Sequence, residues 1–134
     1  MCNIDDFIIE DDILLRYLGS DAEVVIPNGV RSISHEAFWY HKSLKSITLP
    51  ASVTSIDARM LCYGDSLEII MVDEGNAVYH SENNCVIETE GKTLIAACNG
   101  SIIPHNGSIT SIGSWAFSGC SGLKNITIPE SVTS

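Results

Sequence analysis

Basic residues are scarce in this chain: seven lysines and arginines stand against 17 acids, and the formal net charge is −10. A phosphate backbone is bound through a basic footprint, so this balance argues against nucleic acid as a partner. It argues equally against an anionic membrane surface. The early acids (Asp5, Asp6, Glu10, Asp11 and Asp12) lack the spacing of a calcium loop, and a solvated face is the simpler interpretation.

Long apolar runs are also missing, since no stretch approaches the roughly 20 residues that a membrane-spanning helix needs. The opening stretch MCNIDDFIIEDD has neither a basic n-region nor a small-residue cleavage site. The sequence therefore predicts no membrane insertion and shows no signal peptide.

The cysteines follow no regular pattern, and their number is odd. A disulfide framework favours even pairing, and a structural zinc site favours a Cys-x-x-Cys spacing. We therefore expect free thiols in a reducing or oxygen-poor setting, and no metal site. The five cysteines are Cys2, Cys62, Cys85, Cys98 and Cys120.

Catalytic motifs are missing as well, because the chain has no Gly-x-Gly-x-x-Gly, no Walker lysine and no His-Glu-x-x-His. Cys85 with His80 is a candidate nucleophile and base, but no orienting group or oxyanion motif accompanies the pair. Cys98 closes the apolar run LIAAC and is better assigned to the core. We expect no enzymatic activity and no cofactor.

Repetition is what the chain does have. LKSITLPASVTS at residues 44–55 returns as LKNITIPESVTS at 123–134, and Ile26-Pro27 returns as Leu49-Pro50 after 23 residues. The same shift relates Val30 to Val53, Ile33 to Ile56, Phe38 to Leu61, Leu44 to Leu67 and Ile47 to Ile70. A further copy starts at Ile103-Pro104 with two extra residues. Units this short cannot bury an apolar face alone, so stacking is expected.

Each unit contains two extended segments and a wedge. Ile47-Thr48-Leu49 alternates inward and outward and ends at a proline, which is typical of a short strand. SVTSI predicts a second, shorter extended or 3-10 segment with Val53 and Ile56 inward. EAF and WAF then supply an aromatic wedge between coils.

These units resemble the 23-residue, Treponema-type leucine-rich repeat of BspA-like surface proteins. IPNGVRSISHEAF, SWAFSGCSGLKNITIPESVTS and the opening FIIEDDILLRYLGSDAEVVIP are similar to that family, as is the irregular middle, VDEGNAVYHSENNCVIETEGKTLIAACNG. The resemblance implies a fragment of a longer repeat array. The second unit departs from the pattern, because Met60-Leu61 replaces Ala-Phe and Asp73 replaces the proline.

The predicted fold is a mainly-β, leucine-rich-repeat solenoid of about five rungs in one domain, 1–134. We expect an N-terminal capping hairpin in 1–20, in which apolar residues alternate around Asp11-Asp12, and repeats in 21–72; the alternating residues are Phe7, Ile9, Ile13, Leu15 and Tyr17. An irregular insertion in 73–100 would carry a hairpin near 84–98, around Glu90-Gly91, and 101–134 would hold further repeats. Rungs are expected near 22–27, 44–50, 67–72, 101–104 and 123–129. Because the last unit stops without its Ala-Phe pair, we expect an open edge there that favours pairing with another chain.

Side-chain alternation also predicts an outward strand face. The 23-residue shift places Val25, Thr48 and Met71 in one column and Glu23, Ser46 and Ile69 in its neighbour. The other outward residues are Ile102, Asn125 and Thr127. A mixed apolar and acidic patch of this kind would contact a protein partner or a second copy. Alternatively, the insertion hairpin covers Ile69 and Met71, which would then be satellite core.

Two functions remain open. In the first, the strand face is a binding surface for a protein or glycan. BspA-like proteins are typically surface-associated adhesins, so the resemblance implies a cell-surface or secreted parent and a host or extracellular-matrix partner. In the second, the array is a structural spacer or self-assembly module with no ligand of its own.

Overall fold

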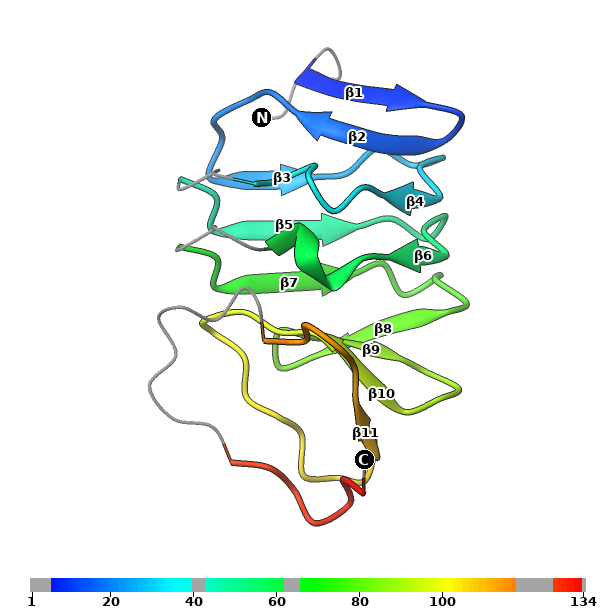
Figure 1. The fold of residues 1–134 in the computed structure, drawn as a ribbon, viewed down its shortest axis with the longest axis vertical. Helices are drawn as coiled ribbons and strands as arrows, with labels where there is room; N and C mark the ends of the chain where they lie inside the picture. Colours follow the sequence, from blue (N-terminus) through cyan, green and yellow to red (C-terminus); the bar gives the residue numbers. More distant parts are fainter. Residues whose placement is uncertain (1–5, 40–42, 62–65, 118–126, 134) are drawn as a thin grey trace.

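A computed structural model describes residues 6–39, 43–61, 66–117 and 127–133. Short strands stack one below another from the N-terminal hairpin downward (Figure 1), which confirms the mainly-β repeat architecture. A short 3-10 helix, η2 (Ala58–Leu61), follows β6. The strands are β1 Phe7–Glu10, β2 Ile13–Tyr17, β3 Glu23–Val25, β4 Ser32–Ile33, β5 Ser46–Leu49, β6 Ser55–Ile56, β7 Ile69–Val72, β8 Tyr79–Glu82, β9 Cys85–Glu88, β10 Thr93–Ala96 and β11 Ser111–Ile112.

The strands β3, β5 and β7 form a parallel sheet whose register is the predicted shift of 23 residues. Val24 pairs with Ile47, and Ile47 pairs with Ile70. All three side chains are buried, while the neighbouring positions in each strand face outward. A one-residue slip would turn this buried column to solvent, so burial holds the register.

The second row of parallel pairs joins β2, β4 and β6, with Leu14 opposite Ile33 and Ile33 opposite Ile56. The expected short extended segment in SVTSI is therefore confirmed. Val53 is fully buried, whereas Ile56 is only partly buried and packs against the edge of the core.

The N-terminal hairpin is confirmed, with Asp11 and Asp12 in the left-handed conformation that a tight two-residue turn requires. The alternation expected along its second strand is wrong. The buried side chains are Leu14 and Tyr17, three positions apart, and Ile13 is exposed. The pairing skips Leu15, and this β-bulge carries the inward direction from Leu14 to Tyr17.

The hairpin expected near 84–98 is β9 with β10, and a further strand, β8, precedes it. Asn83 and Asn84 have φ angles of 50° and 64° and form the turn between β8 and β9, a turn that was not predicted from the sequence. β9 is buried on both faces: Val86 packs into the first core cluster, and Cys85 and Ile87 into the second. We call β8, β9 and β10 the insertion; it is a wall between two cores.

The rung expected at 101–104 contains no strand, although Ile103 is buried and the neighbouring Ile102 is exposed. The backbone of Ile102 donates to the carbonyl of Asn83 in the β8–β9 turn, so this segment is bonded to the insertion instead of to β7. Of the rung expected at 123–129, only 127–129 lie in the described part, and they form no strand there.

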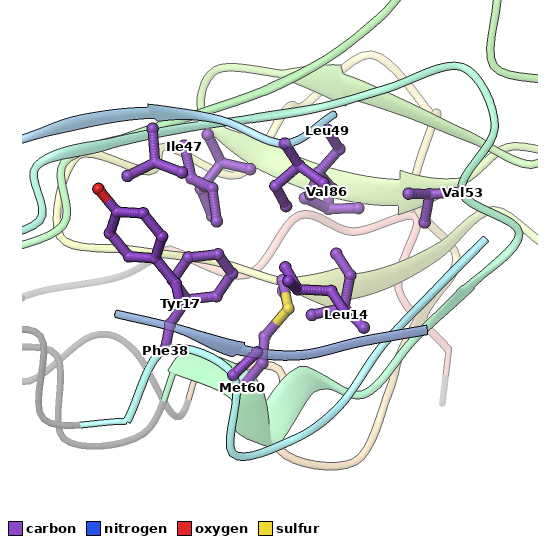
Figure 2. Packing of buried hydrophobic residues seen from close by; sticks show 14 of the residues in the cluster. Leu14, Tyr17, Phe38, Ile47, Leu49, Val53, Met60 and Val86 are labelled. Carbon is purple, nitrogen blue, oxygen red and sulfur yellow. The ribbon is translucent and has the colours of Figure 1, made fainter. Parts of the chain in front are cut away.

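The first core lies between the two parallel rows. Figure 2 shows Ile47 and Leu49 from β5 facing Leu14, Phe38 and Met60 across the interior. The wedge expected from EAF is confirmed, because Ala37 and Phe38 are buried, and Met60 is buried in the next coil. Aromatic contacts connect this wedge to the hairpin. The ring centroid of Tyr17 lies 5.0 Å from that of Phe7 and 5.8 Å from that of Phe38.

One amide side chain joins the regular coils to the insertion. Nδ2 of Asn76 donates to the carbonyls of Pro50 (3.1 Å) and Val53 (2.9 Å) in the coil before it. Its Oδ1 accepts from the backbone nitrogens of Val78 and Tyr79, both at 2.8 Å, at the start of β8. Both hydrogens of the Asn76 amide group and both lone pairs of its oxygen are therefore bonded to the backbone. Asn76 thus fixes the position at which β8 begins.

We therefore expect Asn76→Ala to destabilise the fold by about 2–4 kcal/mol, because partly buried backbone groups lose their partners. Asn76→Asp keeps the acceptor but turns a carboxylate oxygen toward the Pro50 and Val53 carbonyls, which repel it, so its cost at neutral pH is expected to be at least as large. Urea unfolding followed by circular dichroism measures both. Asn28→Ala, at an exposed asparagine, is the control and is expected to change stability by less than about 0.5 kcal/mol. Equal midpoints for Asn76→Ala and the wild type would contradict this role.

Candidate functional site

The sheet β3-β5-β7 carries the predicted columns on its outer face. Glu23, Ser46 and Ile69 are paired neighbours. Val25, Thr48 and Met71 are paired neighbours in the second column. Parallel ladders place such neighbours about 4.8 Å apart, so the six side chains form one continuous surface, which we call the strand face.

The apolar members of the strand face are open to solvent. Val25 is 61% exposed, Ile69 42% and Met71 53%. The alternative, in which the insertion covers Ile69 and Met71, is therefore wrong. The insertion continues the stack beyond β7, because its β9 strand separates the two cores and does not fold back over the sheet.

The remaining predicted residues do not join these columns. Ile102 is 69% exposed, yet it follows the insertion, and its backbone contacts the β8–β9 turn. Thr127 is exposed, and no strand pairing connects it to β7. Asn125 lies outside the described residues. The structure thus brings together six of the expected side chains.

His80 and Cys85 are not arranged as a base and a nucleophile. Nδ1 of His80 lies 2.8 Å from Oγ1 of Thr89, and Nε2 lies 2.7 Å from Oε2 of Glu82, so both ring nitrogens are occupied. Asn106 donates to the other oxygen of Glu82 at 3.0 Å. This bond, together with that from His80, holds the pKa of Glu82 below its usual range despite partial burial. The cluster ties residues 105–107 to β8.

Cys85 and Cys98 are fully buried free thiols on the two sides of the insertion wall. Burial raises the pKa of Cys85 to about 11 and also raises that of Cys98. The hydroxyl of Ser101 donates to the carbonyl of Asn84 at 2.6 Å and lies 3.7 Å from the Cys98 sulfur. Since the thiolate is the reactive form, both thiols are inert at neutral pH. The assignment of Cys98 to the core is confirmed.

A second surface feature was not identified from the sequence. A groove of about 600 Å³ lies on the side of the β4 and β6 strands, between η2 and the turn at Gly113–Trp115. The motif WAF predicts Trp115 in an aromatic wedge, but Trp115 is 61% exposed and lines this groove. Its neighbours Ala116 and Phe117 pack into the second core as expected.

The described part of the chain contains no group of three or more His, Cys, Asp or Glu side chains arranged to hold a metal ion. The same residues include no helix with the length and hydropathy that a membrane crossing requires.

The buried thiols generate a labelling prediction. In the native protein at pH 8, Cys85 and Cys98 are expected to remain unmodified by iodoacetamide, because little thiolate forms and neither sulfur is accessible. After unfolding in urea both are expected to react, and titration of the unfolded chain should count five thiols. Peptide mass spectrometry assigns the adducts. Rapid modification of Cys85 in the folded chain, or fewer than five thiols, would contradict this account.

Comparison with known proteins agrees with the repeat. A family profile described as a BspA type leucine rich repeat region, with six copies, matches residues 16–86 and 91–134. A solved leucine-rich repeat protein from Eubacterium ventriosum matches with a TM-score of 0.66 and 24% identity, over 83% of this chain and 30% of its own. The pneumococcal vaccine antigen PcpA matches with a TM-score of 0.61 and 20% identity, over 86% of this chain and 35% of its own. A comparison with curated proteins gives no match.

The chain thus spans about a third of the length of these two structures, and at such identities the similarity establishes the fold alone. The family profile, in contrast, covers most of the sequence, and its first matched range, 16–86, contains the strands β3, β5 and β7 that pair at a shift of 23 residues. The chain belongs to the BspA-type leucine-rich repeat family.

Proposed function

We propose that this domain is a non-catalytic binding module that contacts a protein partner through its strand face. The observation that carries the proposal is the exposure of Val25, Ile69 and Met71 in adjacent columns of one parallel sheet. Apolar side chains grouped in this way lower the free energy when a partner covers them. Met71 also adapts its shape to different partners, because its side chain is unbranched and flexible.

The polar members of the face supply specificity. Ser46 and Thr48 offer hydroxyl groups between the apolar side chains, and Glu23 places a carboxylate at one edge. With a formal net charge of −10, the domain favours a partner whose contact surface is basic. Nucleic acid remains disfavoured for the same reason.

The setting that we propose is the surface of a bacterial cell or its exterior, as part of a longer protein. The family resemblance supports this setting, and the similar protein PcpA is described as a vaccine antigen. The partner class is then an extracellular-matrix or other host protein, or a second copy of the array. A spacer without a ligand would have little reason to expose three apolar side chains in adjacent columns.

The test is a double substitution, Ile69→Ser with Met71→Ser. Binding of the wild-type domain to immobilised fibronectin, laminin and collagen is measured by surface plasmon resonance, and self-association by analytical ultracentrifugation. We expect the double variant to lose about tenfold or more in whichever interaction the wild type shows, since two apolar anchors of roughly 1 kcal/mol each are removed.

The matched control is Ile8→Ser with Ile13→Ser, which changes two similarly exposed isoleucines (39% and 37%) on the N-terminal hairpin. This control is expected to keep the interaction. The proposal fails if the folded strand-face variant binds as tightly as the wild type, or if both pairs of substitutions weaken binding equally. It also fails if the strand-face variant is unfolded in circular dichroism, because the two side chains would then be core.

A further inference from the structure

The groove beside η2 lies where the insertion interrupts a series of similar turns. Turns follow β4, β6 and β11, and in each a backbone nitrogen donates to the carbonyl three residues earlier: Ala37 to Ser34, Met60 to Asp57 and Ala116 to Gly113. The first two turns belong to successive coils, while the insertion separates the second from the third. The groove is the space between these last two turns, and Ile95 of β10 contributes to its lining.

One wall of the groove is held rigid without any ligand. The Arg59 guanidinium donates to both oxygens of Asp57, at 3.1 and 2.7 Å, and the backbone nitrogen of Arg59 donates to Asp57 at 3.0 Å. The indole nitrogen of Trp39 donates to the Arg59 carbonyl at 2.9 Å, and the His35 ring packs edge-on against Trp39. A wall organised in advance loses little conformational entropy when a ligand binds.

The opposite wall carries a strained aromatic residue. Trp115 has a φ of 64°, in the left-handed region that bulky residues avoid. It stands at the third position of its turn, where a positive φ normally calls for glycine or asparagine. The equivalent residues Glu36 and Arg59 do not have positive φ angles. The strain is not offset by burial, because the Trp115 side chain is 61% exposed. Strain of this kind is concentrated at functional sites.

The chemistry of the lining selects among ligand classes. Four serines line the groove, together with His35, the Asp57–Arg59 pair, three isoleucines and Trp115; the serines are Ser32, Ser34, Ser55 and Ser114. The cation among these groups, Arg59, is already paired with Asp57, so an anionic ligand has no unpaired positive charge to meet. A purely apolar ligand is also disfavoured, because it would cover the serine hydroxyls without giving them hydrogen-bond partners.

We propose that this groove binds a short, neutral oligosaccharide. The apolar C–H face of a pyranose ring stacks on the Trp115 indole, whose negative face attracts the partially positive hydrogens. The serine hydroxyls and the Asp57–Arg59 pair exchange hydrogen bonds with the sugar hydroxyls. A volume of about 600 Å³ lies within the range of small-molecule sites. The left-handed backbone at Trp115 directs the indole to the groove, and this accounts for the strain.

This site is separate from the strand face, since no residue of the strand face lines the groove. The two proposals therefore fail independently. A variant with Ile69→Ser and Met71→Ser is expected to retain saccharide binding, and a Trp115 variant is expected to retain binding through the strand face.

The test uses the chain's two tryptophans. Their indole N–H resonances are followed by nuclear magnetic resonance, and the spectrum of Trp115→Gly identifies the signal of Trp115. Cellotriose, maltotriose, mannotriose and chitotriose are titrated to millimolar concentration, beside an anionic trigalacturonate and a mixture of random decapeptides. At least one neutral trisaccharide is expected to shift the Trp115 signal saturably.

Trp115→Ala and Trp115→Gly are expected to weaken this binding at least about tenfold, and Trp115→Phe to retain part of it. Because glycine accepts a positive φ, Trp115→Gly is expected to melt no lower than the wild type, so its loss of binding is not a loss of folding. The proposal is overturned if no neutral trisaccharide binds, if Trp115→Ala binds the sugar with wild-type affinity, or if only the decapeptides or the anionic sugar shift the signal.

Discussion

The hydrogen bonds that join each coil to the coil before it are the constraint on which the rest of the structure depends. Backbone ladders supply part of this bonding, and hydroxyl side chains supply the rest. Oγ of Ser52 accepts from the nitrogen of Gly29 at 2.9 Å and donates to the carbonyl of Val30 at 2.7 Å. Ser131, at the equivalent place in a later unit, donates to Ile109 at 2.7 Å. The recurrence of SVTS therefore has a physical reason: its first serine satisfies backbone groups that the preceding turn leaves unpaired.

Because the coils repeat at a fixed spacing, each position of the repeat forms a column of side chains along the stack, and each column faces either the core or solvent. An inward column such as Val24, Ile47 and Ile70 must be apolar, because water is excluded there. An outward column is free of that demand, so its composition can follow function. Ile69 and Met71 stand in outward columns where Ser46 and Thr48 show that polar residues are equally compatible with the fold.

The repeat was predictable from the sequence because it is local and periodic: apolar letters at a fixed shift specify both the register of β3, β5 and β7 and the outward columns. Features that break the period were not predictable. Because of the bulge at Leu15, Leu14 is buried and Ile13 is exposed, the reverse of what the apolar alternation predicts. The alternation itself gives no indication of the bulge. The strand β8 was missed although Asn83-Asn84 is a plausible turn pair. The groove is still harder to predict, because it joins residues of β4 and β6 to the turn that follows β11, and only the insertion brings these segments together.

The insertion also determines which kind of contact the domain can make. A parallel sheet that ends at an open edge invites strand addition by another chain. At β7, however, the insertion side of the edge is occupied: the Val72 nitrogen donates to Oγ of Ser81, and just before the strand the Leu67 carbonyl accepts from the Asn99 nitrogen. Backbone pairing with a partner strand is therefore blocked at this level of the stack. The outer face of β7 remains accessible, so recognition there depends on side chains such as Ile69 and Met71. Side-chain contacts discriminate between partners better than backbone pairing alone.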